Sequence, residues 1–493
     1  LLSPANFNIA ISGNFIDNGI NIEYYDEFEY QIDVSLNQSG FPISSSEIRS
    51  NPLVIDLDNN GVNEIIIGDY NGVIHIYNAD GSELLNETFP FDTGNQIWGS
   101  AASADMDGDG FLEFAVPSKN KHLYIFDHEG LKLDYETSLY LIGTPAIGNL
   151  DNDQDLEIVF SGYSNNNKVF AINLDGSNVE GFPFNLNEKT KAAPALADFN
   201  GNNLDDIVIG TDDDKLYLIY DNATIAPGFP FIADDKFQVA PSILSYNEDQ
   251  YIYAGNNDKN LYVINSDGSL NFSILTSDRI ITSASFIQIE NSIYSFFASR
   301  DNYIYAINTQ GENLNSWPKS FDGNIKGEII FSNLNNDQYP EIIISSEAGK
   351  LFAIDSNGEY YNYFPINNNL PFTGSPMIID LDLDNDLEIL TGSLNSFTVI
   401  DIKDLGYSDT DYWNMFRANN KRTGFINLTY ESCNQEFGDV NGDLYINILD
   451  LVQIANYIIE ISIPNYICAA DFNQDDLINI LDLVLIANYI LQN

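Results

Sequence analysis

The stretch that decides the fold reads Pro52-Leu-Val-Ile-Asp56-Leu-Asp58-Asn-Asn60-Gly61, and it continues as Glu64-Ile-Ile-Ile-Gly68 and Gly72-Val-Ile-His-Ile-Tyr77. Its short β-branched and aromatic runs, bounded by turn residues, predict strands. The same order recurs in seven further units, whose first segments are Ser100–Asp105, Pro145–Asn149, Pro194–Asp198, Pro241–Ser245, Ser283–Ile287, Ile329–Asn333 and Pro376–Asp380. The spacing of about 46 residues is typical of one propeller blade. We therefore expect a mainly β chain with an eight-bladed β-propeller of four-stranded blades.

A second recurring signal, Gly-Phe-Pro, indicates how the ring closes. It occurs at Gly181-Phe182-Pro183 and Gly228-Phe229-Pro230, where proline suits an outermost edge strand. An additional copy, Gly40-Phe41-Pro42, precedes the first unit, whereas the last unit has no clear copy after Asp401. We therefore expect a strand near residues 36–44 to complete the last blade. An open linear solenoid is the alternative.

The repeats divide the chain into three parts. The propeller is expected to span residues 36–427, with a separate module at 428–493. Residues 1–35 form an N-terminal strand segment, in which Ile20–Val34 resembles a strand and is read as the remnant of an upstream immunoglobulin-like domain. The first residue is Leu1, so we expect a processed product or the tail of a longer precursor.

Charge limits the partners of this chain. Its 493 residues include 73 acidic and 19 basic ones, for a formal net charge of −54. Such a surface repels nucleic acids and anionic lipid, and no apolar run reaches the ~18 residues that span a bilayer. We expect neither nucleic-acid binding nor membrane insertion. The acidity suits divalent cations, although it also serves solubility alone.

The two cysteines, Cys433 and Cys468, lie near the C-terminus. Each precedes one of two similar acidic loops, which favours a single disulfide and an oxidising, extracellular compartment. Two free thiols are the alternative.

Most repeat units share an acidic loop between their first two strands. In the second unit the loop carries Asp105, Asp107 and Asp109, with Glu113 at the ninth position. Oxygen side chains in this spacing suit calcium, whereas zinc or copper would need histidine or cysteine. The six candidate ligand sets are Asp56, Asp58, Asn60 and Glu64; Asp105, Asp107, Asp109 and Glu113; Asn149, Asp151, Asp153 and Glu157; Asp198, Asn200, Asn202 and Asp206; Asn333, Asn335, Asp337 and Glu341; and Asp380, Asp382, Asp384 and Glu388.

Units five and six break this pattern, because Tyr253 replaces the ninth-position carboxylate in one, and Ile287 and Ile289 replace early ligands in the other. We expect these two units to be empty. Asp and Asn are also ordinary turn residues, and the repetition of one spacing in six loops is what favours metal binding.

These units resemble the FG-GAP or VCBS repeats of integrin-type propellers over roughly residues 40–405. The segment Trp413-Asn-Met-Phe416-Arg417-Ala-Asn-Asn-Lys-Arg422-Thr-Gly424 resembles a signature that accompanies such propellers in secreted bacterial proteins. The resemblance implies calcium in the loops and a scaffold or recognition role, but it does not identify a ligand. A carbohydrate or a cell-surface protein is our expectation for the partner of the propeller.

The C-terminal part holds one motif twice. Each copy is a twelve-residue loop with oxygen side chains at positions 1, 3, 5, 9 and 12 and a backbone carbonyl at position 7, as in an EF-hand calcium loop. A Leu-Val-x-Ile-Ala-Asn-Tyr-Ile run follows each loop and predicts a short amphipathic helix. The candidate ligands are Asp439, Asn441, Asp443, Tyr445, Asn447 and Asp450 in the first copy, and Asp471, Asn473, Asp475, Leu477, Asn479 and Asp482 in the second.

This duplicated motif resembles a type I dockerin, which implies a calcium-folded α-helical module that binds a cohesin-like domain. The family's recognition positions fall on Ile448, Leu449, Ala455, Asn456, Ile480, Leu481, Ala487 and Asn488. The sequence departs from the family at loop position 6, where Leu444 and Asp476 replace glycine, and in its aliphatic recognition pairs, where many dockerins have Ser or Thr. An EF-hand-like cap that folds back on the propeller is the alternative.

No catalytic motif stands out. His75 and His122 fall in predicted strands and His128 in the following turn, and neither a metalloprotease helix nor a nucleophile elbow is present. We therefore expect a non-enzyme. A polysaccharide lyase carried by a dockerin is one alternative, and a structural or adhesive cell-surface protein is another.

Overall fold

The computed structural model describes residues 2–17, 20–247, 249–289, 292–335, 337, 339–403, 412–428, 437–442, 445–458, 467–470, 472 and 478–492. The chain splits into two compact units, one of Leu1–Ser245 and Asp249–Asn427, the other of Leu428–Asn493 with Tyr246–Glu248.

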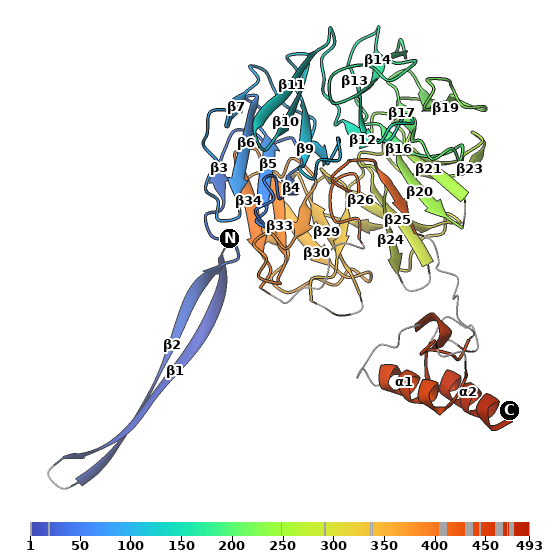
Figure 1. Ribbon diagram of the computed structural model, residues 1–493. Coiled ribbons are helices and arrows are strands. Elements are labelled where there is room, and N and C mark those ends of the chain that lie inside the picture. The colour runs from blue at the N-terminus through green and yellow to red at the C-terminus, as the bar shows by residue number, and fades with distance from the viewer. Residues whose placement is uncertain are drawn as a thin grey trace. The chain divides into compact units, whose positions relative to one another are not determined.

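The first unit contains eight antiparallel sheets that follow one another around a ring (Figure 1). Blades 1 to 4 consist of β4 (Leu53–Ile55), β5 (Glu64–Gly68), β6 (Val73–Asn78) and β7 (Phe91–Asp92); β8 (Ala102–Ala104), β9 (Glu113–Pro117), β10 (His122–Asp127) and β11 (Gly130–Glu136); β12 (Ala146–Gly148), β13 (Glu157–Ser161), β14 (Lys168–Ile172) and β15 (Phe184–Asn185); and β16 (Ala195–Ala197), β17 (Asp206–Gly210), β18 (Lys215–Ile219) and β19 (Phe231–Ile232).

Blades 5 to 8 consist of β20 (Ser242–Tyr246), β21 (Asp249–Gly255), β22 (Asn260–Asn265) and β23 (Leu270–Leu275); β24 (Ser285–Ile289), β25 (Ser292–Ala298), β26 (Tyr303–Asn308) and β27 (Lys319–Ser320); β28 (Ile330–Ser332), β29 (Glu341–Ser345), β30 (Lys350–Ile354) and β31 (Ile366–Asn367); and β32 (Met377–Ile379), β33 (Glu388–Gly392), β34 (Ser396–Asp401) and β3 (Ile43–Ser44). The predicted eight-bladed propeller is confirmed.

The hydrophobic core lies between neighbouring blades. Ile66 and Ile74 of blade 1 pack in one cluster with Phe114 and Phe126 of blade 2, and all four side chains are buried. The second strand of each blade is apolar on both faces because each face packs on a neighbour. This explains continuous runs such as Glu64-Ile-Ile-Ile-Gly68, in which every residue is buried.

Proline shortens most of the outermost strands. An aromatic-Pro pair precedes β3, β7, β15, β19, β27 and β31, each of which is two residues long. Blades 2 and 5 lack the pair, and their outermost strands β11 and β23 have seven and six residues. Proline has no N–H for the ladder, so it limits the pairing of an edge strand. The expected edge role of Gly-Phe-Pro is confirmed, and Phe89-Pro90 and Trp317-Pro318 extend it to blades 1 and 6.

The ring closes through its N-terminal strand, as predicted. Ile43 and Ser44 pair with Phe397 and Ser396 of β34. Upstream of this pairing, the N–H of Gln38 donates to the Val399 carbonyl at 2.9 Å, and the N–H of Asp401 donates to the Leu36 carbonyl at 2.8 Å. The last blade therefore takes its outermost strand from the start of the chain.

Before this closure, β1 (Leu2–Asp17) and β2 (Ile20–Ser35) form a two-stranded antiparallel hairpin. The strand expected at Ile20–Val34 lies within β2. Its origin in an immunoglobulin-like domain stays a prediction.

Residues 412–428 bind the innermost strands of the ring. Backbone N–H groups of Ser103, Ile147, Leu196, Ile243, Phe331 and Ile378, in six innermost strands, donate to carbonyls of this segment at 2.8–3.0 Å. Its last part, β35 (Phe425–Asn427), pairs in parallel with β20 and gives blade 5 a fifth strand that the sequence did not predict.

Two buried arginines extend these contacts. Arg422 donates to the carbonyls of Pro52 and Ala101 at 2.7 and 2.9 Å, and Arg417 donates to those of Pro194 and Pro241 at 3.1 and 2.6 Å. The Trp413 ring meets Phe286 of blade 6 edge-on, 5.5 Å between centroids. Every blade therefore contacts the segment, which we call the axial plug.

The second unit contains α1 (Ile448–Ile458), a short 3₁₀ helix η1 (Ile467–Ala470) and α2 (Ile480–Gln492). Val440, Ile454, Ala469, Ala470 and Ile486 form its buried core. The predicted ligands Asp443, Asp471, Asn473, Asp475 and Leu477 lie outside the described residues, as do Leu444, Asp476 and Cys433. Pairing of Cys433 with Cys468 stays a prediction.

Candidate functional site

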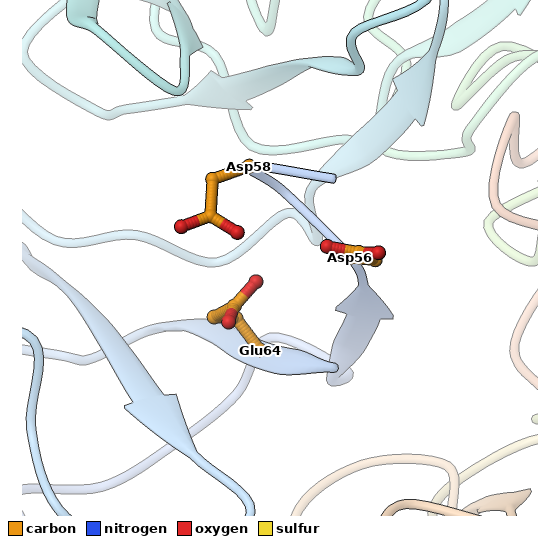
Figure 2. Close-up of side chains that lie close together, drawn as sticks. All are labelled: Asp56, Asp58 and Glu64. Carbon is orange, nitrogen blue, oxygen red and sulfur yellow. The ribbon is translucent and has the colours of Figure 1, made fainter. Parts of the chain in front are cut away.

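The acidic loops bring carboxylates together in four blades. Three side chains in each offer oxygens that all lie within 4.8 Å of one another: Asp56, Asp58 and Glu64; Asp105, Asp107 and Glu113; Asp151, Asp153 and Glu157; and Asp380, Asp382 and Glu388. Figure 2 shows the first group, in which two carboxylates come from the loop after β4 and the third from the start of β5.

The ninth-position carboxylate holds each loop in shape. One oxygen of Glu64 accepts the backbone N–H of Leu57 at 2.9 Å, and the corresponding bonds join Asp206 to Phe199 at 2.9 Å and Glu388 to Leu381 at 2.6 Å. Glu113, Glu157 and Glu341 make the same bond in their loops. The strand therefore fixes the carboxylate, and the carboxylate fixes the turn.

Several oxygens in these loops fit a cation. Asp105 Oδ1, Asn149 Oδ1 and Glu157 Oε1 are buried without a hydrogen-bond partner in the described part of the chain. Burial raises the pKa of Glu157, Asp206 and Glu341 to about 7 in each case, and the charges of nearby carboxylates add to this effect. A hard cation with oxygen ligands would satisfy such atoms and cancel their repulsion, which makes the donor set suitable for calcium.

Blade 2 brings its own positive charge into the loop. The ammonium of Lys132, from β11, lies 2.8 Å from Glu113 Oε1 and 3.3 Å from Asp107 Oδ2. Burial alone would lower the pKa of Lys132, but the hydrogen bond and charge of Glu113, together with Asp107, raise it. This lysine was not predicted, because only the pairing of β10 with β11 reveals that it reaches the loop.

Two other loops also contain residues that the spacing rule missed. In blade 8, Asp386 joins Asp384 and Glu388 in a second group of close carboxylates, and burial with the charges of Asp382 and Asp386 raises the pKa of Glu388. In blade 4, Asp221 follows β18 and lies 3.1 Å from the Asn202 amide nitrogen.

Blades 5 and 6 use for strand pairing part of the region that forms the acidic loop in other blades. Their first strands are five residues long, and in blade 6 the pairing continues to Ile289 and Ser292. Tyr253 and Ile287, which stand at the ligand positions, are buried in strands. Within the described residues, no group of three close carboxylates occurs in these two blades.

The histidines are engaged with neighbouring side chains. His75 Nδ1 lies 2.6 Å from Glu83, His122 Nδ1 lies 2.5 Å from Asp134, and the His128 ring stacks on Phe111. His75 lies in β6, His122 in β10 and His128 in the turn between β10 and β11.

In the C-terminal module, the last residue of each loop organises it from the following helix. Buried Asp450 accepts the N–H groups of Val440, Asn441 and Asn447 at 3.0, 3.2 and 2.9 Å. Buried Asp482 accepts those of Phe472 and Asn479 at 2.9 and 2.8 Å.

Each helix is also capped by its loop. Asn447 Oδ1 accepts the N–H of Leu449, and Asn479 Oδ1 accepts that of Leu481, both at 2.8 Å. These are N-cap bonds at equivalent positions, so the two copies share one local structure.

The two helices expose the same apolar side chains. Ile448 and Ile480 are 63% and 64% exposed, Leu449 and Leu481 are 58% and 55% exposed, and Val452 and Val484 are both 51% exposed. The valines were not predicted as contact residues, although they lie one turn after the Ile-Leu pairs. Of the other predicted positions, Ala455, Asn456 and Ala487 are half-buried and Asn488 is exposed.

Comparisons with known proteins agree with this description. Residues 437–491 match the dockerin type I domain, a calcium-binding module that docks onto cohesin, and residues 56–116 match the FG-GAP-like repeat. No curated protein matches the chain. None of the helices described here is long and apolar enough to cross a membrane.

Solved structures share the fold at low sequence identity. Sqt1 from Saccharomyces cerevisiae is 10% identical, with a TM-score of 0.56 over 75% of this chain and 100% of that one. The computationally designed Ika8 protein is 13% identical, with a TM-score of 0.51 over 73% of this chain and 98% of that one. The chain is thus an eight-bladed β-propeller with a match to the FG-GAP-like repeat in residues 56–116, followed by a segment, residues 437–491, that matches the dockerin type I domain.

Proposed function

We propose that this chain is a secreted, non-catalytic recognition or scaffold protein, in which calcium stiffens the propeller loops and the dockerin attaches the propeller to a cohesin-like partner. The six acidic loops and the two dockerin loops hold the calcium in this proposal, through the ligands that their sequences predict.

The observation that carries the docking role is the duplicated apolar surface. Ile448 with Leu449, and Ile480 with Leu481, are exposed to nearly equal degrees on two equivalent helices. Exposed aliphatic pairs favour a covering partner. Their internal symmetry allows one partner surface to bind either copy.

The acidic loops support the calcium role because their geometry is repeated. A structural cation would neutralise close carboxylates that otherwise resist ionisation, and it would couple loop order to metal concentration. Secretion fits this role, since free calcium is abundant outside cells.

The test of docking is capture by a panel of type I cohesin domains. Asp450→Ala with Asp482→Ala should abolish capture, because both loops lose the carboxylate that organises them. Replacement of one Ile-Leu pair by Ser-Ser should leave capture nearly unchanged, and replacement of both pairs should remove it. Capture that survives the double Asp→Ala change, or that is lost with a single pair, would contradict the proposal.

The proposal that the chain is not an enzyme has a separate test. Incubation of the full chain with polyuronates, followed by measurement of unsaturated sugar ends, should give no product. Product formation would favour a dockerin-borne polysaccharide lyase instead.

A further inference from the structure

A groove on the rim of blades 2 to 4 combines aromatic and basic side chains. Its volume is about 510 Å³, and its lining includes Trp98, Lys119, Tyr140, Tyr163 and Lys191. These residues come from the turns after β9 and β13 and from the loops before β8, β12 and β16. They all belong to loops at the end of the blades opposite the acidic loops, since strands alternate in direction.

The backbone fixes the positions of these loops. The N–H of Lys119 donates to the Gln96 carbonyl at 3.0 Å, and the N–H of Tyr163 donates to the Tyr140 carbonyl at 2.8 Å. Gln96 Oε1 accepts bonds from Lys119 Nζ at 2.6 Å and from Trp98 Nε1 at 3.1 Å. The groove is therefore preorganised by bonds that join neighbouring loops.

Cations lie beside each aromatic ring. Lys119 Nζ is 4.1 Å from the Trp98 ring centroid, and Lys121 Nζ is 5.4 Å from that of Tyr140. Lys189 and Lys191 lie 5.5 and 5.7 Å from the Tyr163 ring. The aromatic side chains of Trp98, Tyr140 and Tyr163 thus each have one or two lysine ammonium groups next to them.

The loops that supply the groove residues carry a net positive charge, although the neighbouring turn after β17 adds Asp212, whose N–H donates to the Lys189 carbonyl at 2.7 Å and whose carboxylate interacts with Tyr163. The loop segments 93–101, 118–121, 137–145 and 162–167 contain Lys119 and Lys121 and no acidic residue, although the chain has 73 acids. Segment 187–194 adds Lys189, Lys191 and one acid, Glu188, which is bonded to Lys215.

The lysines of the groove also lack acidic partners. Elsewhere, Lys132, Lys215, Lys326, Lys350 and Lys403 each pair with a carboxylate. Within the described chain, no ion pair joins Lys119, Lys121, Lys189 or Lys191 to an acid. Lys119 and Lys191 line the groove, and Lys121 and Lys189 lie beside the aromatic rings that line it, so these four ammonium groups can bind an external anion.

A smaller cavity of about 260 Å³ adjoins the groove through Trp98, Ile142 and Lys191, and Phe416 of the axial plug also lines it. The groove itself is lined by loops on the rim, so we expect a polymer to lie across the rim.

We propose that this groove binds a segment of an acidic polysaccharide, with sugar rings stacked on Trp98, Tyr140 and Tyr163 and uronate carboxylates bound by the adjacent lysines. Aromatic side chains and lysines alternate along the groove, which matches a polymer of flat, partly apolar sugars that carry one carboxylate each. A nucleic acid, with a denser phosphate charge than a polyuronate, would be repelled more strongly by a protein of charge −54. This inference rests on the proposed recognition role of the propeller and names its ligand class.

The test is affinity electrophoresis of the full chain in gels that contain polygalacturonate, alginate or hyaluronan, with hydroxyethyl cellulose as the neutral polymer and oligo-dT as competitor. At least one polyuronate should retard the protein. Trp98→Ala should weaken the retardation at least tenfold, and Lys119→Gln with Lys191→Gln should weaken it about tenfold and reduce its dependence on salt.

Matched controls separate this effect from misfolding. Lys236→Gln and Tyr303→Ala change exposed residues in loops or strand ends outside the groove, and they should leave retardation unchanged. Cohesin capture by every variant is measured in parallel, so loss of the saccharide site is distinguished from failure of docking. Retardation by none of the three polyuronates, equal retardation by the neutral polymer, displacement by oligo-dT, or no effect of the groove variants would overturn the proposal.

Discussion

At the scale of single residues, the ninth-position carboxylate of each acidic loop both stabilises the loop and offers an oxygen to the proposed calcium ion. One oxygen of Glu157 accepts the Leu150 N–H, while the other is buried without a partner among the described residues. The spacing of these ligands could be predicted from the sequence, because it depends on consecutive residues. Contributions from Lys132 and Asp221 could not, because strand pairing brings them to the loops.

The raised pKa values predict how the metal-free propeller responds to pH. Burial holds the pKa of Glu157, Asp206 and Glu341 at about 7, whereas carboxyls in an unfolded chain titrate near 4. Their stabilising contribution is present below the unfolded pKa and is lost as the pH rises through the folded pKa. In a chelator, the melting temperature should therefore fall from about pH 4 to about pH 7, and saturating calcium should remove this decline. A rise over the same range without calcium would contradict the assignment.

The position of Lys132 predicts that the acidic loop of blade 2 binds calcium more weakly than it would without this lysine. Because its ammonium occupies the carboxylate group of blade 2, Lys132→Met should strengthen calcium binding there about tenfold, equivalent to about 1.4 kcal/mol. Lys350→Met is the matched control, since Lys350 pairs with Asp322 away from any acidic loop. Calorimetric calcium titration measures both variants. Weaker binding in Lys132→Met would show that the lysine supports the site.

At the scale of elements, the structural role of the axial plug was the hardest feature to predict from the sequence. The segment resembled a known signature, but its role follows only from its contacts: buried Arg417 and Arg422 donate to carbonyls of four different blades. Long-range contacts of this kind leave no local periodicity. By contrast, the blades and their edge prolines follow local patterns, and they could be predicted.

Buried Arg417 of the plug interacts electrostatically with the buried carboxylate of Glu328, which precedes β28. Glu328 Oε2 accepts the backbone N–H of Arg417 at 2.7 Å and Trp413 Nε1 at 3.0 Å; burial raises the pKa of Glu328, and the Arg417 charge opposes that rise. Arg417→Met should lower the free energy of unfolding by about 3–5 kcal/mol, because it leaves an uncompensated buried carboxylate.

Adding Glu328→Gln to Arg417→Met should recover part of this loss, because the amide oxygen still accepts the two N–H groups without a charge. Lys421→Met, an exposed change in the same segment, should have little effect. Urea denaturation measures the series. Equal stability of Arg417→Met and Lys421→Met would exclude a structural role for the buried pair.

At the scale of the whole molecule, closure by β3 joins the beginning of the propeller to its end. Phe41 packs in one buried cluster with Phe397 and Val399 of the last blade. The closure could be predicted from the spare Gly-Phe-Pro copy, whereas the basic groove could not, because its residues come from five separate loops in a strongly acidic chain.

Two truncations test the closure. Removal of residues 1–35 leaves the bonds of Leu36 and Gln38 with the last blade and should not change the melting temperature of the propeller. Removal of residues 1–44 also takes β3 and Phe41, so it should lower that temperature and expose the edge of β34 to aggregation. If both truncations behave alike in scanning calorimetry, the pairing of β3 with β34 does not close the ring.

The most direct test of the central claim is calorimetric titration of a panel of type I cohesin domains into the full chain, with calcium and again after chelation. We expect binding of one cohesin per chain, because the two equivalent faces compete for one partner, and loss of binding in the chelator. Binding that persists without calcium, or no binding to any cohesin of the panel, would contradict it.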